Sequence, residues 1–249
     1  MADTAIREES VTIDGARFEW LAQSTVRVRF ADGFIVYFDP IRLDTAPPLA
    51  DLILITHHHV DHCLPEFIVP IRGPKTQVAA FHDSYVKYCV KDIKGVRTVK
   101  TGQTVTLGEA RITGIDAYTR RGFHSKGEGC GFILEYKGVT VYFSGDTSRI
   151  DEMGQLGRVD VAIMPIADNT YTIDAMDMVE AVKTIKPRLF IPVHFTPEDE
   201  PDPVVKEGMF STKDIRFFTR KADPAALLPC FEGTGIKMVM LRKLTKPGE

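Results

Sequence analysis

Four of the seven histidines of this 249-residue chain fall within the segment THHHVDHC, from Thr56 to Cys63. His57 and His59 are two residues apart, and side chains at such positions of an extended segment point the same way. Both imidazoles can therefore reach one point. Asp61 and His62 follow, where the chain can turn into a helix, and could serve a second metal ion at the separation of about 3.5–4 Å used in hydrolysis. Imidazole and carboxylate are ligands for zinc and similar ions, so the segment predicts a metal site.

Three more polar residues each follow an apolar, strand-like run farther along the chain. They are Asp39 in FDP, Asp146 in SGDT and His194 in PVHF. Each is a weak signal alone, since an aspartate after a strand is usually a turn or capping residue. Together with the histidine segment they indicate one site at a shared sheet edge. His58 lies between two ligand candidates, and strand alternation predicts that it points away and binds no metal.

The residues around this site predict mostly strands. Residues 51–55, DLILI, are a continuous apolar run, typical of a strand buried on both faces, and lead directly into the histidines. Ligand sites of layered α/β folds collect at the carboxyl ends of such strands. Asp32 and Gly33 predict a hairpin turn, and Asp174 is a candidate N-cap for a helix over residues 173–185. We also expect a helix over residues 82–91 and strands over residues 16–30, 34–38, 77–81, 104–107, 110–117, 131–136, 139–144, 159–165, 189–193 and 236–244.

β-rich and helix-containing stretches alternate twice along the chain. This order predicts an α/β fold in which two packed sheets have helices outside them, a four-layer αββα sandwich. No linker or low-complexity segment interrupts the pattern, so we expect one hydrolase-type domain over residues 1–249. Residues 196–203, rich in proline and acidic residues, predict a loop, and residues 204–229 carry no clear pattern.

The order of these motifs resembles the metallo-β-lactamase superfamily, which has HxHxDH, then GDT, then VH. The resemblance spans roughly Val36 to Phe195. It implies the αββα sandwich and a metal-dependent hydrolase. Finer motifs, HSKG, YFSGDT and MPIAD followed by YTID, are similar to a branch of small prokaryotic metal-dependent hydrolases that includes the L-ascorbate-6-phosphate lactonase. That branch is chemically broad and does not determine the substrate.

The resemblance also implies a role for each matching residue. The implied ligands are His57 and His59 for the first ion, Asp61, His62 and His194 for the second, and Asp146 as a bridge between them. Asp39 would accept a hydrogen bond from a ligand imidazole and so determine its tautomer. We therefore expect one or two divalent ions, with zinc favoured over manganese, iron or nickel.

One ligand of the family pattern is missing from its usual place. The family normally has a histidine near a strand end where this chain has Ala117 and Tyr118. The other histidines are His58, His82 and His124, and His82 is expected to be a helix cap or surface residue. His124 lies in a glycine-rich loop beyond the empty position, and three interpretations stay open: the third ligand, a substrate-binding or acid–base residue, or an ordinary loop residue. Without a replacement the first site would be weaker and only partly filled.

The site predicts hydrolysis without a serine or cysteine nucleophile, and the chain has no GxSxG motif. A metal ion lowers the pKa of its bound water from about 15.7 towards about 7, so hydroxide forms at neutral pH. Asp146 would hold the hydroxide, Asp61 could orient it, and His124 is a candidate acid–base residue. The hydroxide would attack a small ester, lactone or phosphodiester.

The loop over residues 119–127 carries Arg120, Arg121 and Lys126 and no acidic residue. We expect it to bind an anionic small-molecule substrate, with Tyr118 lining the pocket. The alternative is a basic loop that is merely solvated.

Composition limits the remaining classes of function. The formal net charge of −3 gives no reason to expect nucleic-acid binding, so a nuclease-type phosphodiesterase is disfavoured. A protein that binds metal or ligand without turnover is the other alternative. No apolar run reaches about 18 residues and the N-terminus lacks a signal peptide, so we expect no membrane partner. A homo-oligomer stays open.

The cysteines are expected to be reduced thiols in a cytoplasmic protein, because they form no CxxC pair. They are Cys63, Cys89, Cys130 and Cys230. Contact of Cys63 with a metal ion is a minor alternative.

Overall fold

The computed structural model describes residues 8–81, 95–120, 122–166, 172–197 and 221–244. Within these residues the strands form two seven-stranded sheets. The first sheet contains, in spatial order, β1 (Val11–Ile13), β2 (Ala16–Ala22), β3 (Thr25–Phe30), β4 (Ile35–Phe38), β5 (Ala50–Ile55), β6 (Arg72–Phe81) and β7 (Arg97–Val99). The second contains β14 (Lys237–Met238), β13 (Leu189–Val193), β12 (Val161–Pro165), β11 (Val139–Phe143), β10 (Cys130–Tyr136), β9 (Ala110–Asp116) and β8 (Thr104–Leu107).

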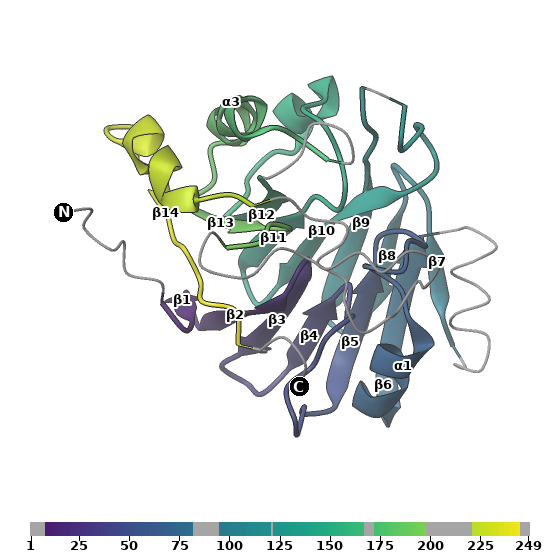
Figure 1. Ribbon diagram of the computed structural model, residues 1–249. Coiled ribbons are helices and arrows are strands. Elements are labelled where there is room, and N and C mark those ends of the chain that lie inside the picture. Colours follow the sequence, from purple (N-terminus) through teal and green to yellow (C-terminus); the bar gives the residue numbers. More distant parts are fainter. Residues whose placement is uncertain (1–7, 82–94, 121, 167–171, 198–220, 245–249) are drawn as a thin grey trace, which may run out of the picture.

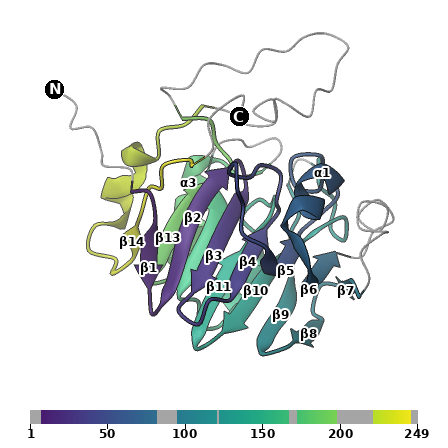
Figure 2. The ribbon, with the colours of Figure 1, turned by 90° about the horizontal axis from the view of Figure 1, so that it is seen from below.

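The two sheets repeat one topology. In the first sheet β1 to β4 pair antiparallel, and β4 to β7 pair parallel. In the second sheet β8 to β11 pair antiparallel, and β11 to β14 pair parallel. Each half therefore presents the carboxyl ends of parallel strands, and Figures 1 and 2 show the two sheets stacked face to face.

Apolar side chains fill the space between the sheets. Phe38 of β4 stacks on Phe143 of β11, with ring centroids 4.7 Å apart, and Trp20 of β2 stacks on Phe195, just after β13, at 4.8 Å. Each of these pairs joins the two sheets, so burial of large aromatic surfaces holds the two halves of the site together.

Helices cover the outer faces of both sheets. Helix α3 (Ala175–Ile185) packs outside the second sheet, and α1 (Pro65–Ile68) lies outside the first (Figure 1). The short 3-10 helices are η1 (Val69–Ile71), η2 (Asp151–Gln155) and η4 (Pro224–Phe231). The predicted αββα sandwich is confirmed. None of the helices within the described residues is long and apolar enough to cross a membrane.

Strand β5 shows why the histidine segment lies where it does. Leu52 and Leu54 join the core between the sheets, while Ile53 and Ile55 join a second apolar cluster on the outer face. The strand is thus buried on both faces, as its sequence predicts. Cys63 lies in the same outer cluster and is not among the groups of candidate metal ligands in the described residues, and no disulfide joins the cysteines that the structure describes.

Most predicted elements are present with shifted ends. Asp174 caps α3, because its Oδ1 accepts hydrogen bonds from the N–H groups of Met176 and Asp177. Residues 16–30 form two strands, with a turn between β2 and β3. The strand predicted over 236–244 is only β14, since the chain beyond Met238 makes a single bridge between Leu241 and Glu8. The predicted helix over 82–91, with His82, and most of 204–229 lie outside the described residues.

Candidate metal centre

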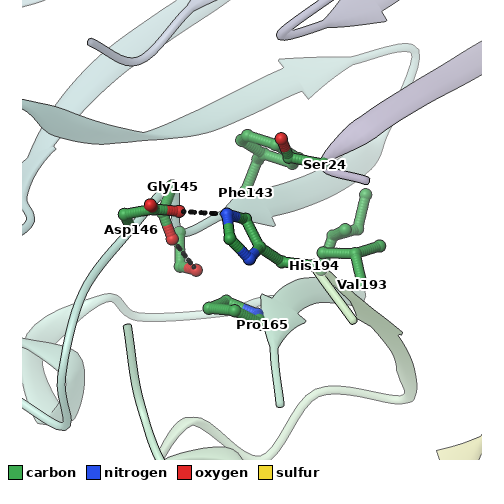
Figure 3. A pocket seen from close by; sticks show the side chains of 9 residues that line it. Ser24, Phe143, Gly145, Asp146, Pro165, Val193 and His194 are labelled. Carbon is green, nitrogen blue, oxygen red and sulfur yellow. Dashed lines mark hydrogen bonds and ion pairs between the residues drawn. The ribbon is translucent and has the colours of Figure 1, made fainter. Parts of the chain in front are cut away.

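Strand ends of both sheets bring the polar residues together at one edge. Asp39 directly follows β4, and His194 directly follows β13. Asp146 follows β11 and Gly145, whose φ of 59° is left-handed. A Cβ on Gly145 would lie 3.0 Å from Cβ of Thr56, so only glycine permits this approach of the two sheets without displacement. Figure 3 shows Asp146 and His194 facing each other at this edge.

A tight turn divides the histidine segment into two groups. The backbone N–H of His62 donates to the carbonyl oxygen of His59 at 2.9 Å. Asp61 and His62 consequently join one group of side chains, whereas His57 and His59 join another. The expected change to helix does not occur at Asp61. The turn comes first, and α1 begins only at Pro65.

The group that includes Asp61 and His62 also contains a donor atom from each of Asp146 and His194. We call it the second cluster, because the resemblance assigns Asp61, His62 and His194 to the second metal ion. Nε2 of His194 lies 3.4 Å from Oδ2 of Asp61 and 3.3 Å from Oδ1 of Asp146. Nε2 of His62 lies 3.6 Å and 3.3 Å from the same two oxygens. The two Nε2 atoms are 3.3 Å apart. All four residues are buried.

The dimensions of the second cluster fit a tetrahedral metal site. Zinc binds imidazole nitrogen and carboxylate oxygen at about 2.0–2.2 Å, and the edges of the corresponding tetrahedron are about 3.3–3.6 Å long. The five donor–donor distances given above run from 3.3 to 3.6 Å. These residues can therefore hold one zinc ion, or an ion of similar size, with five of the six edges of the tetrahedron already at this length.

The other group is His57, His59 and His124, and we call it the first cluster. The donor atoms lie within 4.8 Å of one another, and the ring centroids are 4.7 to 4.9 Å apart. His57 and His124 are buried, whereas His59 is partly exposed. Among the described residues His58 belongs to neither cluster. The structure thus brings a third imidazole to the pair that the sequence places two residues apart.

His124 reaches the first cluster because the loop after β9 closes on itself. The N–H of Thr119 donates to the carbonyl oxygen of His124, and the N–H of His124 donates to Oγ1 of Thr119, both at 2.9 Å. Gly122, with a φ of 76°, makes the turn between them. The loop therefore returns His124 to the strand end, where Ala117 and Tyr118 offer no ligand. This geometry favours the third-ligand interpretation over the other two.

Asp146 lies between the two clusters with one oxygen facing each. Its Oδ1 is 3.3 Å from Nε2 of both His62 and His194. Its Oδ2 is 3.5 Å from Nε2 of His124 and 3.9 Å from Nε2 of His57. A carboxylate that bridges two metal ions needs this arrangement.

Buried polar atoms without partners give a further test of the fit. Among the described residues, Nε2 of His57, Nε2 of His124 and Oδ1 of Asp146 are buried and accept or donate no hydrogen bond. Each such group costs about 1–3 kcal/mol in a protein interior. Metal ions at the two clusters would coordinate all three atoms, so the residues present fit metal binding.

Asp39 holds one ligand candidate from behind. Its carboxylate accepts hydrogen bonds from the N–H and Oγ1 of Thr56, at 2.8 and 2.6 Å, and its Oδ2 lies 2.7 Å from Nδ1 of His62. A proton on Nδ1 leaves the lone pair of Nε2 directed into the second cluster. Burial raises the pKa of Asp39, although these hydrogen bonds act in the opposite direction.

The two clusters differ in protonation. Burial lowers the pKa of His57 well below its ordinary value and that of His59 to about 4, and neighbouring imidazoles add to the effect. Burial acts the same way on His62 and His194, but the carboxylates of Asp146 and Asp61 together outweigh it. The pKa of His62 therefore lies well above its ordinary value, and that of His194 rises to about 9.

The predicted substrate loop is only partly available to a ligand. Nζ of Lys126 lies 2.6 Å from Oε1 of Glu152 and 3.1 Å from Oδ2 of Asp116. The hydroxyl of Tyr118 donates to Oε2 of Glu152 at 3.2 Å. Nζ of Lys126 also lies 5.3 Å from the centre of the Tyr118 ring. Two carboxylates from outside the loop therefore balance the charge of Lys126.

Of the two loop cations that the structure describes, Arg120 is the less closely paired. Both side chains are 57% exposed, but the nearest carboxylate to Arg120, Oδ2 of Asp177, is 3.8 Å away. The backbone N–H of Arg120 donates to Oγ of Ser148 at 3.1 Å, which ties the loop to the segment after Asp146. Arg121 lies outside the described residues.

Two buried residues of the site have no signal in the sequence. Gln23 and Ser24 form the turn between β2 and β3 and lie against Asp61, His62 and His194. A glutamine followed by a serine in a turn is ordinary. Only the packing of the first sheet on the second shows that this turn reaches the site.

Comparison with known proteins gives matches over the same region. A family model described as beta-lactamase superfamily domain matches residues 17–194. A UPF0173 metal-dependent hydrolase of Pelotomaculum thermopropionicum is 33% identical over 167 residues, 62% of this chain and 72% of that protein. A UPF0173 metal-dependent hydrolase of Koribacter versatilis is 29% identical over 210 residues, 74% of this chain and 85% of that protein.

A solved structure supports the fold. A metal-dependent hydrolase of Parabacteroides distasonis superposes with a TM-score of 0.74 and covers 96% of this chain and 99% of its own. At 23% identity this likeness establishes the arrangement of the two sheets and nothing about the substrate.

Proposed function

The chain belongs to the UPF0173 family of metal-dependent hydrolases, within the beta-lactamase superfamily, and we propose that it hydrolyses a small substrate between its two clusters. The observation that carries the proposal is the position of Asp146. One oxygen lies 3.3 Å from the imidazoles of the second cluster, and the other lies 3.5 Å from His124 of the first. Two metal ions sharing this carboxylate would lie close enough to act on one bond.

Divalent ions at such ligands lower the pKa of coordinated water towards about 7 and polarise a carbonyl or phosphoryl oxygen. The protein's own contribution is to keep its carboxylates ionised. Burial alone would raise the pKa values of Asp61 and Asp146, but the imidazoles of His62 and His194 lower both. Asp61 and Asp146 are therefore charged at neutral pH and can bind metal ions and accept hydrogen bonds from water or substrate.

We propose zinc as the metal. The donor set of the second cluster, two imidazoles and two carboxylates, suits zinc, and its donor–donor distances of 3.3 to 3.6 Å match tetrahedral zinc coordination. Manganese, iron and nickel accept the same ligand types but favour higher coordination numbers or other geometries.

The substrate that we propose is a small anionic ester, lactone or phosphodiester. Arg120 supports an anionic group because its exposed guanidinium has no carboxylate nearer than 3.8 Å among the described residues. Lys126 gives little support, since Glu152 and Asp116 already balance its charge. The motif HSKG, which resembles the lactonase branch, makes a phosphorylated lactone one candidate.

The alternative, a binding protein without turnover, takes its support from the missing third histidine. The donor atom of His124 lies within 4.8 Å of those of His57 and His59, which supports a site of three imidazoles despite that loss. This proximity weakens the reason for preferring the alternative.

Hydrolysis of three substrate classes by zinc-loaded protein tests the proposal. The compounds are p-nitrophenyl acetate, a phosphorylated γ-lactone and bis(p-nitrophenyl) phosphate, each assayed before chelation, after chelation and after zinc is restored. We expect turnover of at least one class that chelation removes and zinc restores. His58→Ala, at a histidine outside both clusters, is the matched control and should retain activity. Protein that binds two zinc ions and turns over none of the three classes would support the binding-protein alternative instead.

Arg120→Ala tests the anionic preference. We expect it to raise KM for an anionic substrate more than for a neutral one of the same class, because the guanidinium contacts only the charge. Arg111→Ala is the control, since Arg111 is an exposed cation of β9 paired with Glu135, away from the site. Equal effects of Arg120→Ala on both substrates would show that the loop is merely solvated.

A further inference from the structure

Gln23 lies in the turn between β2 and β3 and has a strained backbone conformation that two hydrogen bonds stabilise. Its φ is 49°, a left-handed conformation that side chains other than glycine and asparagine rarely adopt. Its carbonyl oxygen accepts hydrogen bonds from Nε1 of Trp20 at 2.7 Å and from the backbone N–H of His194 at 3.0 Å. These two bonds hold the backbone in that conformation. The turn is thereby joined to the end of β13 in the opposite sheet.

The side-chain amide of Gln23 faces two residues of the second cluster. Its Nε2 lies 3.1 Å from Oδ2 of Asp61 and 3.1 Å from Nε2 of His194. A carboxylate oxygen accepts hydrogen bonds, so the atom beside Asp61 is the amide nitrogen and it donates. The carboxylate has further lone pairs, and its bond to Gln23 can persist when Asp61 binds a metal ion.

Ser24 contacts the same two elements of the cluster. Its Oγ donates to the backbone carbonyl oxygen of Asp61 at 3.3 Å and lies 3.3 Å from Nδ1 of His62. Gln23 is 4% exposed and Ser24 is 2% exposed. Two consecutive buried residues therefore hold both the backbone and the side chain of Asp61.

We propose that Gln23 is a positioning residue of the second cluster, whose amide orients the carboxylate of Asp61 beside His194 so that the tetrahedral set of donors exists before metal binds. Asp61, His194 and Gln23 come from three elements distant in sequence, and the amide of Gln23 is a single group that touches both of the others. Without it, Oδ2 of Asp61 could turn about its side-chain bond out of the cluster. This inference rests on the proposed function for the identity of the ligand, a divalent metal ion, but not for the reaction.

Metal affinity in a background with one cluster tests the role. His59→Ala removes a ligand of the first cluster, so the second cluster can be titrated alone, with cobalt followed by calorimetry and by its visible absorption. In this background we expect Gln23→Met, which keeps an unbranched side chain and loses the donor, to weaken cobalt binding about 10- to 100-fold, the range for groups that orient ligands.

Controls separate this role from packing and from the proposed function. Gln77→Met makes the same chemical change at an exposed glutamine of β6 and should leave cobalt affinity unchanged. Gln23→Ala is the second variant if methionine prevents folding, and thermal unfolding of each apo variant reports on that. Equal cobalt affinity with and without the Gln23 amide would overturn the positioning role alone. Absence of cobalt binding by the unsubstituted chain would overturn the proposed function and this inference together.

Discussion

The two clusters share Asp146 but are built from different kinds of structure. The second cluster comes from strand ends and the turn after β5, and its donor–donor distances of 3.3 to 3.6 Å match a tetrahedral ion. The first cluster depends on the loop over residues 119–127 for His124, and His59 is partly exposed. In this cluster Nε2 of His124 lies 3.5 Å from Oδ2 of Asp146, and Nε2 of His57 lies 3.9 Å from the same oxygen. Strand ends impose a narrower geometry than a loop does, so we expect the second cluster to bind metal more tightly.

The two clusters also differ in the charge that surrounds their imidazoles. The first cluster is three imidazoles, and burial keeps the pKa of His57 and His59 low. The second holds two carboxylates that raise the pKa values of His62 and His194 against the effect of burial. A metal ion entering the second cluster gains two negative ligands but must displace protons, whereas the first cluster offers neutral nitrogens.

The largest effect should come from Asp146→Asn, which affects both clusters at once. The amide offers one oxygen and no negative charge, so it cannot bridge. We expect turnover to fall by at least about 10²–10³-fold, the range for loss of a charge-stabilising group in a preorganised site. Steady-state kinetics on zinc-loaded protein measures this. Unchanged turnover would mean that the space between the clusters is not the site of reaction.

His59→Ala should separate the clusters. It removes one of three imidazoles from the first cluster and none from the second, so metal content per chain should fall from about two to about one. Because His59 is partly exposed, the fold should be retained and activity should be lost. Elemental mass spectrometry and thermal unfolding are the measurements. A variant that keeps both ions and full turnover would contradict the ligand assignment.

The pH dependence of metal affinity should also distinguish the clusters. The pKa of His194 is raised to about 9, so its imidazole is protonated below that pH and metal must displace the proton. Zinc affinity of the second cluster, isolated by His59→Ala, should therefore rise about tenfold per pH unit per displaced proton between roughly pH 6 and 8.

The first cluster is the internal control for that titration. The pKa of His59 is about 4 and that of His57 is also low, so both are already neutral at pH 6. Isolated by Asp61→Ala, this cluster should show a shallower rise in zinc affinity over the same range, because two of its three imidazoles have no proton to lose. Competition with a chromophoric chelator measures both constants. Identical slopes would contradict the electrostatic contrast.

Asp39→Asn should weaken the second cluster selectively. An asparagine can no longer accept with full charge from Nδ1 of His62, so the ring and its tautomer are held less firmly. We expect zinc affinity of the isolated second cluster to fall about 10- to 100-fold. The first cluster should be affected less, because Asp39 is linked to it through Oγ1 of Thr56, which lies 3.0 Å from Nδ1 of His57, and not by a direct contact. An equal loss at both clusters would indicate a general disturbance of the fold.

Thr119→Val should give the smallest change and should act on the first cluster. It removes the acceptor for the N–H of His124 and keeps the side-chain shape, at a cost of about 1 kcal/mol, or roughly fivefold in affinity. Thr113→Val, at a partly exposed threonine of β9 that pairs with Thr104, is the matched control. Calorimetric zinc titration of the Asp61→Ala background measures the effect. Equal zinc affinity of the first cluster with and without the Thr119 hydroxyl would contradict the role of the loop.

All four members of the second cluster and two of the three members of the first could be predicted from the sequence. His57, His59, Asp61 and His62 are close in the chain, and their directions follow from local backbone geometry. Asp146 and His194 follow apolar runs, and parallel strands that end at one edge must bring them together. The two-sheet architecture follows from the repeated order of strands and helices.

The tertiary structure decided the rest, because it depends on contacts between residues far apart in sequence. Gln23 and His194 are 171 positions apart in the sequence, and no local pattern marks the glutamine as part of a metal centre. Lys126 and Glu152, likewise distant in sequence, pair in space and remove a charge that the loop sequence alone offers to a substrate.

His124 shows where local prediction ends. The sequence by itself determined that a third imidazole was missing from the strand end, and left three interpretations of His124 open. Only the closed loop, with its paired hydrogen bonds between Thr119 and His124, decided that the imidazole returns to the first cluster. A strand fixes side-chain direction through its own backbone period, whereas a loop takes its direction from the surfaces on which it packs.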